Sequence, residues 1–231
     1  MKPKKRFRLD PESYRHPLET RSLENLKKTK GLQLVINKFH DIGLEENLRI
    51  QYQSSSIRAN ANNFSHLVYL VERAGDVLQS DLMPDLYIHR SDRLEGISLG
   101  IEKPMIIISS HAVDKLSSQE LLFIIGREIA HIGHQHTLYK EIGLIFPDLI
   151  EAFSVVTLGL SSIVSAGLKY ALYQWDLMSE YTADRGGLLA CQDKSASLSI
   201  LAKLAGWPER NWPSINFLEF EEQSRSFDAG P

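Results

Sequence analysis

Three side chains that could do chemistry lie within the otherwise apolar stretch at residues 123–132 of a longer segment, 121–136. Arg127, Glu128 and His131 have apolar neighbours on nearly every face of the expected helix, which predicts that this helix is buried. Charged groups are rarely buried unless they are paired or work at a site, because removing them from water costs several kcal/mol. We therefore expect this helix to carry a functional site.

The spacing of these residues indicates the kind of chemistry. Positions 127 and 131 are four residues apart on one helical face, and Glu128 lies one position further round the helix. With histidine at both ends, the segment would read HExxH, in which two imidazoles hold zinc and the glutamate is the base for metal-bound water. This chain has Arg127 in place of the first histidine.

A second candidate segment lies at residues 173–185. Glu180 and Asp184 are four residues apart on an expected helix. A third zinc ligand, followed one turn later by a carboxylate that orients the ligands, would have this form. Most such pairs, taken alone, belong to solvated helix faces. Together with the first segment, this pair indicates a site between two helices.

These segments resemble the HtpX and CAAX-prenyl-endopeptidase family of zinc metallopeptidases, family 48 of the metallopeptidases, in its soluble single-domain form. The resemblance covers about residues 86–206 and includes an expected strand at residues 105–109, Ser-Gln-Glu-Leu-Leu at 118–122 and Glu-Tyr-Thr-Ala-Asp-Arg at 180–185. The chain departs from the family at Glu95-Gly96, where an Asn-Ala pair is frequent. The resemblance implies a zincin-like fold, in which an active-site helix and a ligand helix pack together beside a small sheet.

The resemblance also implies roles for individual residues. Glu128 would be the general base, His131 and Glu180 would be zinc ligands, and Asp184 would orient them from behind. The substrate would be a peptide or an unfolded protein, extended along the edge of the sheet.

Arg127 changes the expected metal site, because a guanidinium offers no lone pair to a metal. His131 and Glu180 remain where catalytic zinc normally has three protein ligands, so we expect zinc to bind far more weakly. His134 follows His131 by three residues and is the alternative ligand, although a role behind the ligands or at the surface is the simpler interpretation. His136 is expected to point well away from His131.

A guanidinium at this position can also supply the missing positive charge. Glu128, Glu180 and Asp184 would otherwise repel one another around an empty metal position, and a guanidinium pairs well with carboxylates. We therefore predict that Arg127 occupies the metal position and bridges to Glu180 or Asp184.

These expectations lead to three functional hypotheses. In the first, the chain is a metalloendopeptidase whose zinc and Glu128 activate water, with a metal site impaired by Arg127. In the second, it is a pseudopeptidase that keeps the cleft for a peptide or partner and has lost catalysis. The third is a structural role at a membrane surface, which rests on the weakly charged stretch at residues 152–168.

The elements that must position these residues follow from periodicity and capping. Residues 21–39 and 65–78 have helical spacing, whereas 86–88, 97–99 and 105–108 are short β-type runs that suggest a small antiparallel or mixed sheet. Ser117 and Glu120 form a capping box before the helix at 121–136. Further helices are expected at 148–168, 170–191 and 195–205. The fold class is therefore α+β and mainly helical.

Composition limits the remaining possibilities. The 231 residues, 43% hydrophobic and 24% charged, are typical of one globular domain. We divide this domain into a helical part at 1–80, a catalytic core at 86–206 and an extension at 207–231. The net charge of −3 argues against nucleic acid as a partner, and one cysteine fits a reducing, cytoplasmic location. Residues 152–168 are expected to form a buried core helix, with peripheral membrane contact as the alternative.

Overall fold

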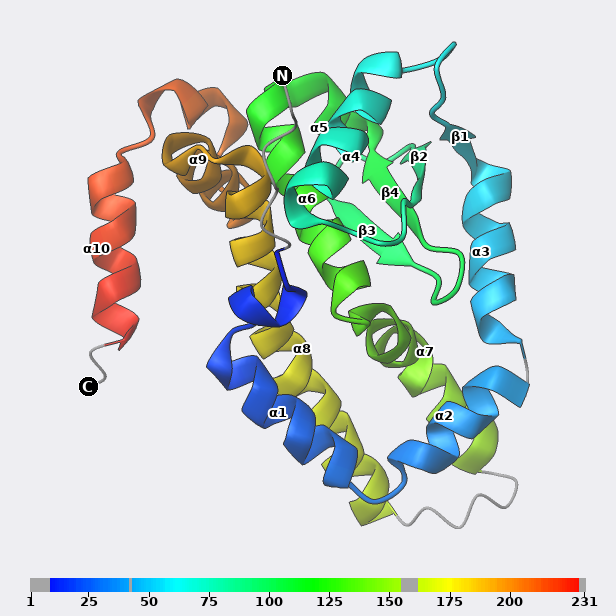
Figure 1. Ribbon diagram of the computed structural model, residues 1–231. Coiled ribbons are helices and arrows are strands. Elements are labelled where there is room, and N and C mark those ends of the chain that lie inside the picture. The colour runs from blue at the N-terminus through cyan, green and yellow to red at the C-terminus, as the bar shows by residue number, and fades with distance from the viewer. Residues whose placement is uncertain (1–8, 42, 155–161, 229–231) are drawn as a thin grey trace.

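The computed structural model describes residues 9–41, 43–154 and 162–228, and it is mainly helical with one small sheet (Figure 1). The first helices are η1 Pro11–Tyr14, α1 Pro17–Lys28, α2 Leu32–Asp41, α3 Leu44–Ser55, α4 Ser65–Leu78 and α5 Ser110–Lys115. The later helices are α6 Ser118–Gly133, α7 His136–Ser154, α8 Ser162–Cys191, α9 Lys194–Leu204, η2 Glu209–Ser214 and α10 Phe217–Asp228. The predicted α+β, mainly helical class is confirmed.

The sheet is mixed, which is one of the two alternatives, antiparallel or mixed, that the β-type runs suggested. Its strands are β1 Ser56–Arg58, β2 Asp85–His89, β3 Gly96–Leu99 and β4 Met105–Ser109, in the order β1-β2-β4-β3. β2 and β4 are parallel, whereas β1 and β3 pair antiparallel at the two edges. β1 was not expected, because three residues are too short to show a period in the sequence. The edge strand β3 is the one that passes α6.

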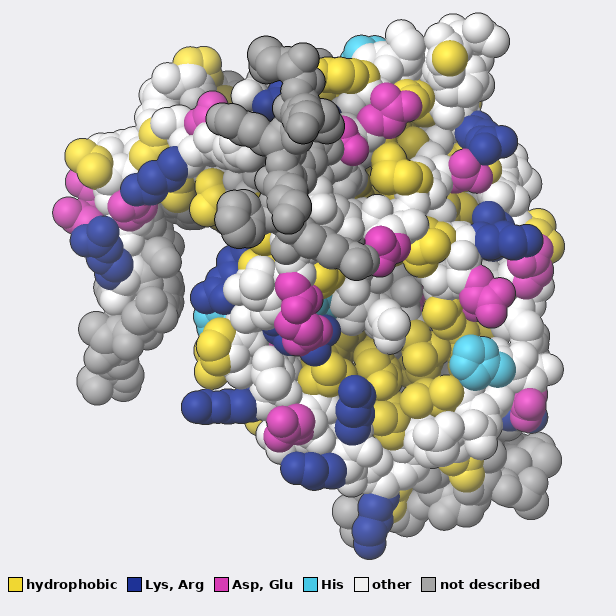
Figure 2. Space-filling model, in the orientation of Figure 1, with side chains coloured by type: hydrophobic (Ala, Val, Ile, Leu, Met, Phe, Trp, Pro, Cys, Tyr) yellow, Lys and Arg dark blue, Asp and Glu magenta, His cyan; other side chains and the backbone are white. Residues whose placement is uncertain are grey.

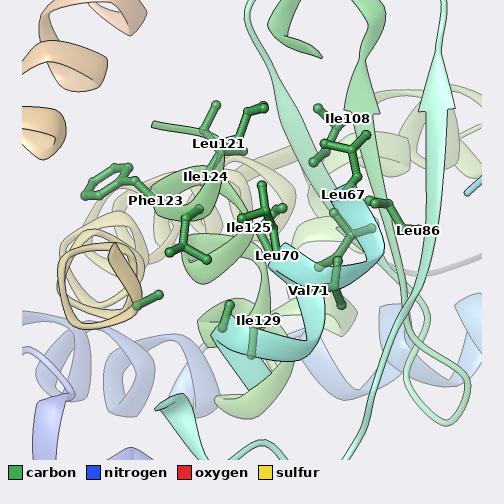
Figure 3. Close-up of a cluster of buried hydrophobic side chains, with 14 of the residues drawn as sticks. Leu67, Leu70, Val71, Leu86, Ile108, Leu121, Phe123, Ile124, Ile125 and Ile129 are labelled. Atoms are coloured by element: carbon green, nitrogen blue, oxygen red, sulfur yellow. The ribbon is translucent and has the colours of Figure 1, made fainter. Parts of the chain in front are cut away.

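The core lies between the sheet, α4 and α6. α6 begins at the predicted capping box, in which the Ser117 hydroxyl accepts from the Glu120 N–H and the Glu120 carboxylate accepts from the Ser117 N–H. Figure 3 shows the apolar side chains of α6 interleaved with those of α4 and the strands. The labelled members are Leu67, Leu70, Val71, Leu86, Ile108, Leu121, Phe123, Ile124, Ile125 and Ile129. Their burial fixes the position of the helix that carries the candidate site.

α6 and α8 lie side by side through the centre of the molecule, separated by small residues (Figure 1). A Cβ at Gly187 would lie 2.8 Å from the carbonyl oxygen of Phe123, and one at Gly126 would overlap Ala190. The two backbones approach this closely because these glycines have no side chain. Close packing of the two helices therefore explains Gly186 and Gly187 in α8 and Gly126 in α6.

Several predicted helix boundaries are wrong. Residues 21–39 form two helices, since Gly31 takes a left-handed conformation (φ +90°) that separates α1 from α2. The helix expected to reach residue 136 ends at Gly133, and Gln135 (φ +58°) turns the chain into α7. The helix expected at 170–191 begins earlier, at Ser162.

The buried core helix that we expected at residues 152–168 falls partly outside the described residues. Residues 155–161 lie outside the described residues, and α8 begins after them. Within α8, Leu168 is buried, but Ala166 and Gly167 are exposed. Across the described residues, every helix is too short or too polar to cross a bilayer.

Hydrophobic side chains also gather in a hollow beside α1, on the face shown in Figure 2. This hollow has a volume of about 880 Å³ and is lined by η1, α1 and the ends of α4 and α6. His136 and Trp175 are among the residues that line this hollow, whereas Glu128 lines a separate cleft.

Candidate metal and active site

Arg127 forms ion pairs with both carboxylates that the sequence placed opposite it. Its Nε lies 2.9 Å from Asp184 Oδ1, and its Nη2 contacts Glu180 Oε2. α8 presents both carboxylates on one face, one helical turn apart, toward α6. Burial opposes the charge on Arg127, but Asp184 and Glu180 outweigh it and raise its pKa. The predicted ion pairing of Arg127 is therefore confirmed.

A second cation, Lys140 of α7, lies in the same site and was missed by the sequence analysis. Its Nζ is 2.5 Å from Glu180 Oε1 and 3.0 Å from Asp176 Oδ1. Glu180 Oε1 is also the oxygen that faces His131, at 3.5 Å from His131 Nε2. The Glu180 oxygen that faces His131 is therefore bound by Lys140 and not by Arg127. Burial favours the neutral carboxyl, yet Lys140 and Arg127 together hold the pKa of Glu180 below its usual range.

Glu128 is almost fully buried where α6 passes under β3. A Cβ built at Gly96, the first residue of β3, would lie 2.5 Å from Ile124 Cγ2 and 3.4 Å from Glu128 Cγ. Gly96 belongs to the Glu95-Gly96 pair at which the chain departs from the family pattern. Because it has no side chain, β3 can lie directly against α6 at this point. Burial raises the pKa of Glu128, although the positive charges of Arg127 and Lys140 oppose the shift.

The second nitrogen of His131 points to the opposite side of α6, toward His136. The two Nδ1 atoms are 2.9 Å apart, which corrects our expectation that His136 points away. That expectation assumed one continuous helix, whereas the turn at Gln135 brings the first residue of α7 back against α6. Burial, followed by the charge of Lys140, holds the pKa of His131 well below its usual range.

The histidine pair ends on a buried carboxylate from α1. Glu19 has no exposed surface. Its Oε1 lies 3.1 Å from His136 Nε2, and its Oε2 accepts from the Thr182 hydroxyl at 2.7 Å. Burial favours the neutral form of Glu19, but His136 and Thr182 outweigh it and lower its pKa. Nothing in the spacing of α1 distinguishes Glu19 from the solvated glutamates near it, so the sequence analysis missed it.

His134 is placed away from Glu180. Its Nδ1 lies 2.9 Å from the carbonyl oxygen of Ala130, and its Nε2 lies 2.9 Å from that of Pro11. Both ring nitrogens therefore face backbone acceptors. This geometry does not support the alternative of His134 as a metal ligand, and it agrees with a packing role between η1 and the end of α6.

A cleft of about 460 Å³ is lined by Arg127, Glu128, His131 and Glu180, but not by the other candidates, Asp184 and His134. β3 forms one wall and α7 and α8 form the other, with Arg127, Glu128 and His131 of α6 at the base. Leu144 and Tyr173 line the cleft and have 59% and 58% of their surfaces exposed. The arrangement provides a strand edge, apolar side chains and a charged base, which together can accept an extended peptide.

Comparison of the sequence with known protein families identifies the family of this chain. The model of peptidase family M48 matches residues 86–227, which is more than half of the chain. This chain belongs to peptidase family M48. An M48 relative, the plastoglobule-localized metallopeptidase 48, chloroplastic, of Arabidopsis thaliana, is 27% identical over 222 residues, covering 95% of this chain. The chain spans 63% of the length of that relative. No solved structure matches the chain significantly.

Membership of M48 leads us to expect a metal, but the residues at this site do not fit zinc. Among the described residues, no three His, Cys, Asp or Glu side chains are arranged to hold a metal ion. The two candidate donors, His131 and Glu180, have a guanidinium and an ammonium beside them. Both Glu180 oxygens are thus paired with cations, and a position that needs three donors has two.

Proposed function

We propose that this M48 chain is a pseudopeptidase, which keeps the cleft to bind an extended peptide and has lost metal-dependent hydrolysis. One observation carries the proposal: each carboxylate oxygen of Glu180 is paired with a positively charged side chain. A divalent ion would have to displace both cations and then bind with two protein ligands. Catalytic zinc sites normally supply three.

Peptide binding is supported by the walls of the cleft. β3 is an edge strand, so the side of its backbone turned away from β4 is open to pairing with an added strand. Leu144 and Tyr173 offer exposed apolar surface opposite this edge. Peptidase families act on peptides or proteins, which supports the same ligand class.

A metalloendopeptidase is the second candidate, and the raised pKa of Glu128 favours it. A general base works best with a pKa near the working pH, and burial raises the pKa of Glu128 in that direction. In this case Lys140 and Arg127 would have to leave Glu180 when zinc binds.

Cleavage assays separate the two candidates. Casein hydrolysis is measured for the parent protein, Arg127→His and Glu128→Gln, with the zinc content of each. Binding of fluorescent casein is measured for the parent and for Glu128→Gln. The proposal predicts that the parent binds casein without cleaving it, and that Glu128→Gln leaves binding unchanged. Stoichiometric zinc and Glu128-dependent cleavage in the parent would contradict it.

The cellular location remains a prediction. The cysteine content supports the cytoplasm. The Arabidopsis relative is named as plastoglobule-localized, which supports the alternative of contact with a lipid surface. A flotation assay of the parent with lipid vesicles distinguishes these alternatives.

A further inference from the structure

The two cations of the site divide Glu180 between them. Arg127 binds Oε2, whereas Lys140 binds Oε1. Oε1 is also the oxygen that lies 3.5 Å from His131 Nε2. A metal shared by His131 and Glu180 would have to bind between those two atoms. We infer that Lys140, and not Arg127 as we predicted from the sequence, holds the metal position, whereas Arg127 occupies the other oxygen of Glu180. This inference rests on the proposed loss of metal binding.

Each cation is also anchored by a carboxylate of its own. Lys140 Nζ lies 3.0 Å from Asp176 Oδ1, and Arg127 Nε lies 2.9 Å from Asp184 Oδ1. Because these two anchors are separate residues on α8, loss of one cation leaves the other held by two carboxylates. Together the two side chains carry the charge of one divalent ion.

Restoring the missing histidine alone is therefore insufficient to rebuild the metal site. Arg127→His adds a donor, but the ammonium of Lys140 stays on Glu180 Oε1 and repels an arriving divalent ion. Lys140→Met keeps most of the aliphatic chain and removes the charge. Metal binding should return only when both substitutions are combined.

The test is a set of zinc affinities, measured by competition with a fluorescent zinc chelator. The proteins are the parent, Arg127→His, Lys140→Met and the Arg127→His/Lys140→Met double variant, each checked for folding by circular dichroism. We expect the double variant to bind one zinc about 100-fold more tightly than Arg127→His. Lys140→Gln replaces Lys140→Met if the latter fails to fold.

Lys169 provides the matched control. It lines the same cleft and is exposed, and no ion pair joins it to Glu180 among the described residues. Arg127→His/Lys169→Met should bind zinc no better than Arg127→His. A general loss of positive charge from the cleft would instead improve both double variants equally, and that result would overturn the inference.

Two further results would overturn it. If Arg127→His binds zinc as tightly as the double variant, Lys140 is no obstacle to the metal. A folded double variant that binds no zinc would mean that something other than Lys140 keeps the metal out of the site. These affinities are independent of the casein assay: an inactive parent with zinc restored by Arg127→His alone would leave the pseudopeptidase proposal intact and remove only the role of Lys140.

Discussion

At the scale of single residues, the buried groups behind the site hold one another in place. His131, His136 and Glu19 form a continuous chain from α6 through α7 to α1, and all three are almost completely buried. A buried carboxylate is tolerated there because His136 and Thr182 occupy its oxygens. Loss of one member therefore leaves another buried group without its partner.

Glu19→Ala should accordingly destabilise the protein by about 2–4 kcal/mol, because it leaves His136 Nε2 and the Thr182 hydroxyl buried without their acceptor. Urea unfolding followed by circular dichroism measures the change. Glu24→Ala is the control, since Glu24 pairs with Lys28 on the exposed face of the same helix and should cost less than about 1 kcal/mol. A loss below about 1 kcal/mol for Glu19→Ala would show that the chain of contacts adds little to stability.

Glu141 gives a prediction of pH dependence. Its Oε1 accepts from the Gly100 N–H at 2.6 Å, and burial raises its pKa to about 7 in spite of this bond. Between the ordinary value of 4.5 and about 7, the folded state binds the proton more strongly than the unfolded state. The contribution of Glu141 is therefore present at low pH and is lost as the pH rises through this range.

Glu141→Gln removes this titration, so its stability relative to the parent should be greater at pH 8 than at pH 5. The free energy of unfolding of the variant minus that of the parent should be about 1–2 kcal/mol larger at pH 8 than at pH 5, as measured by urea unfolding. Glu46→Gln, at an exposed position, controls for the change in net charge. Equal relative stabilities at both pH values would rule out a buried, protonated Glu141.

At the scale of the elements, the site depends on how closely α6 and α8 approach. A Cβ at Gly126 would overlap that of Ala190 and lie 3.1 Å from the carbonyl oxygen of Gly186. A wider separation would carry Arg127 and His131 away from Glu180, because the first two lie on α6 and the last on α8.

Gly126→Ala should therefore destabilise the protein by about 1–2 kcal/mol, even though alanine favours a helix more than glycine does by about 1 kcal/mol. Gly133→Ala is the matched control in the same helix, since a Cβ there would meet nothing within 4 Å. Thermal unfolding of both variants gives the comparison. If Gly126→Ala proves as stable as Gly133→Ala, the close packing does not limit the separation of the helices.

At the scale of the whole molecule, the sequence predicted what local spacing determines. The capping box at Ser117 marked the start of α6, and the resemblance to the metallopeptidase family, rather than spacing alone, paired Arg127 with Glu180. Lys140 and His136 were beyond its reach, because both depend on the left-handed turn at Gln135 that redirects the chain.

The role of Glu19 was out of reach for a different physical reason. Glu19 meets Thr182 only because α1 packs along α8, and a helical period shows which face is apolar but not which helix will cover it. Contacts between residues far apart in the chain are thus the part of the site that only the structure provides.

Crystals of the parent grown with excess zinc, with diffraction recorded at the zinc absorption edge, test the central claim most directly. Our account predicts no anomalous peak between His131 and Glu180, with Lys140 and Arg127 still bound to the two oxygens of Glu180. A peak at that position, with zinc bound by His131 and Glu180 and with Arg127 turned to solvent, would contradict it.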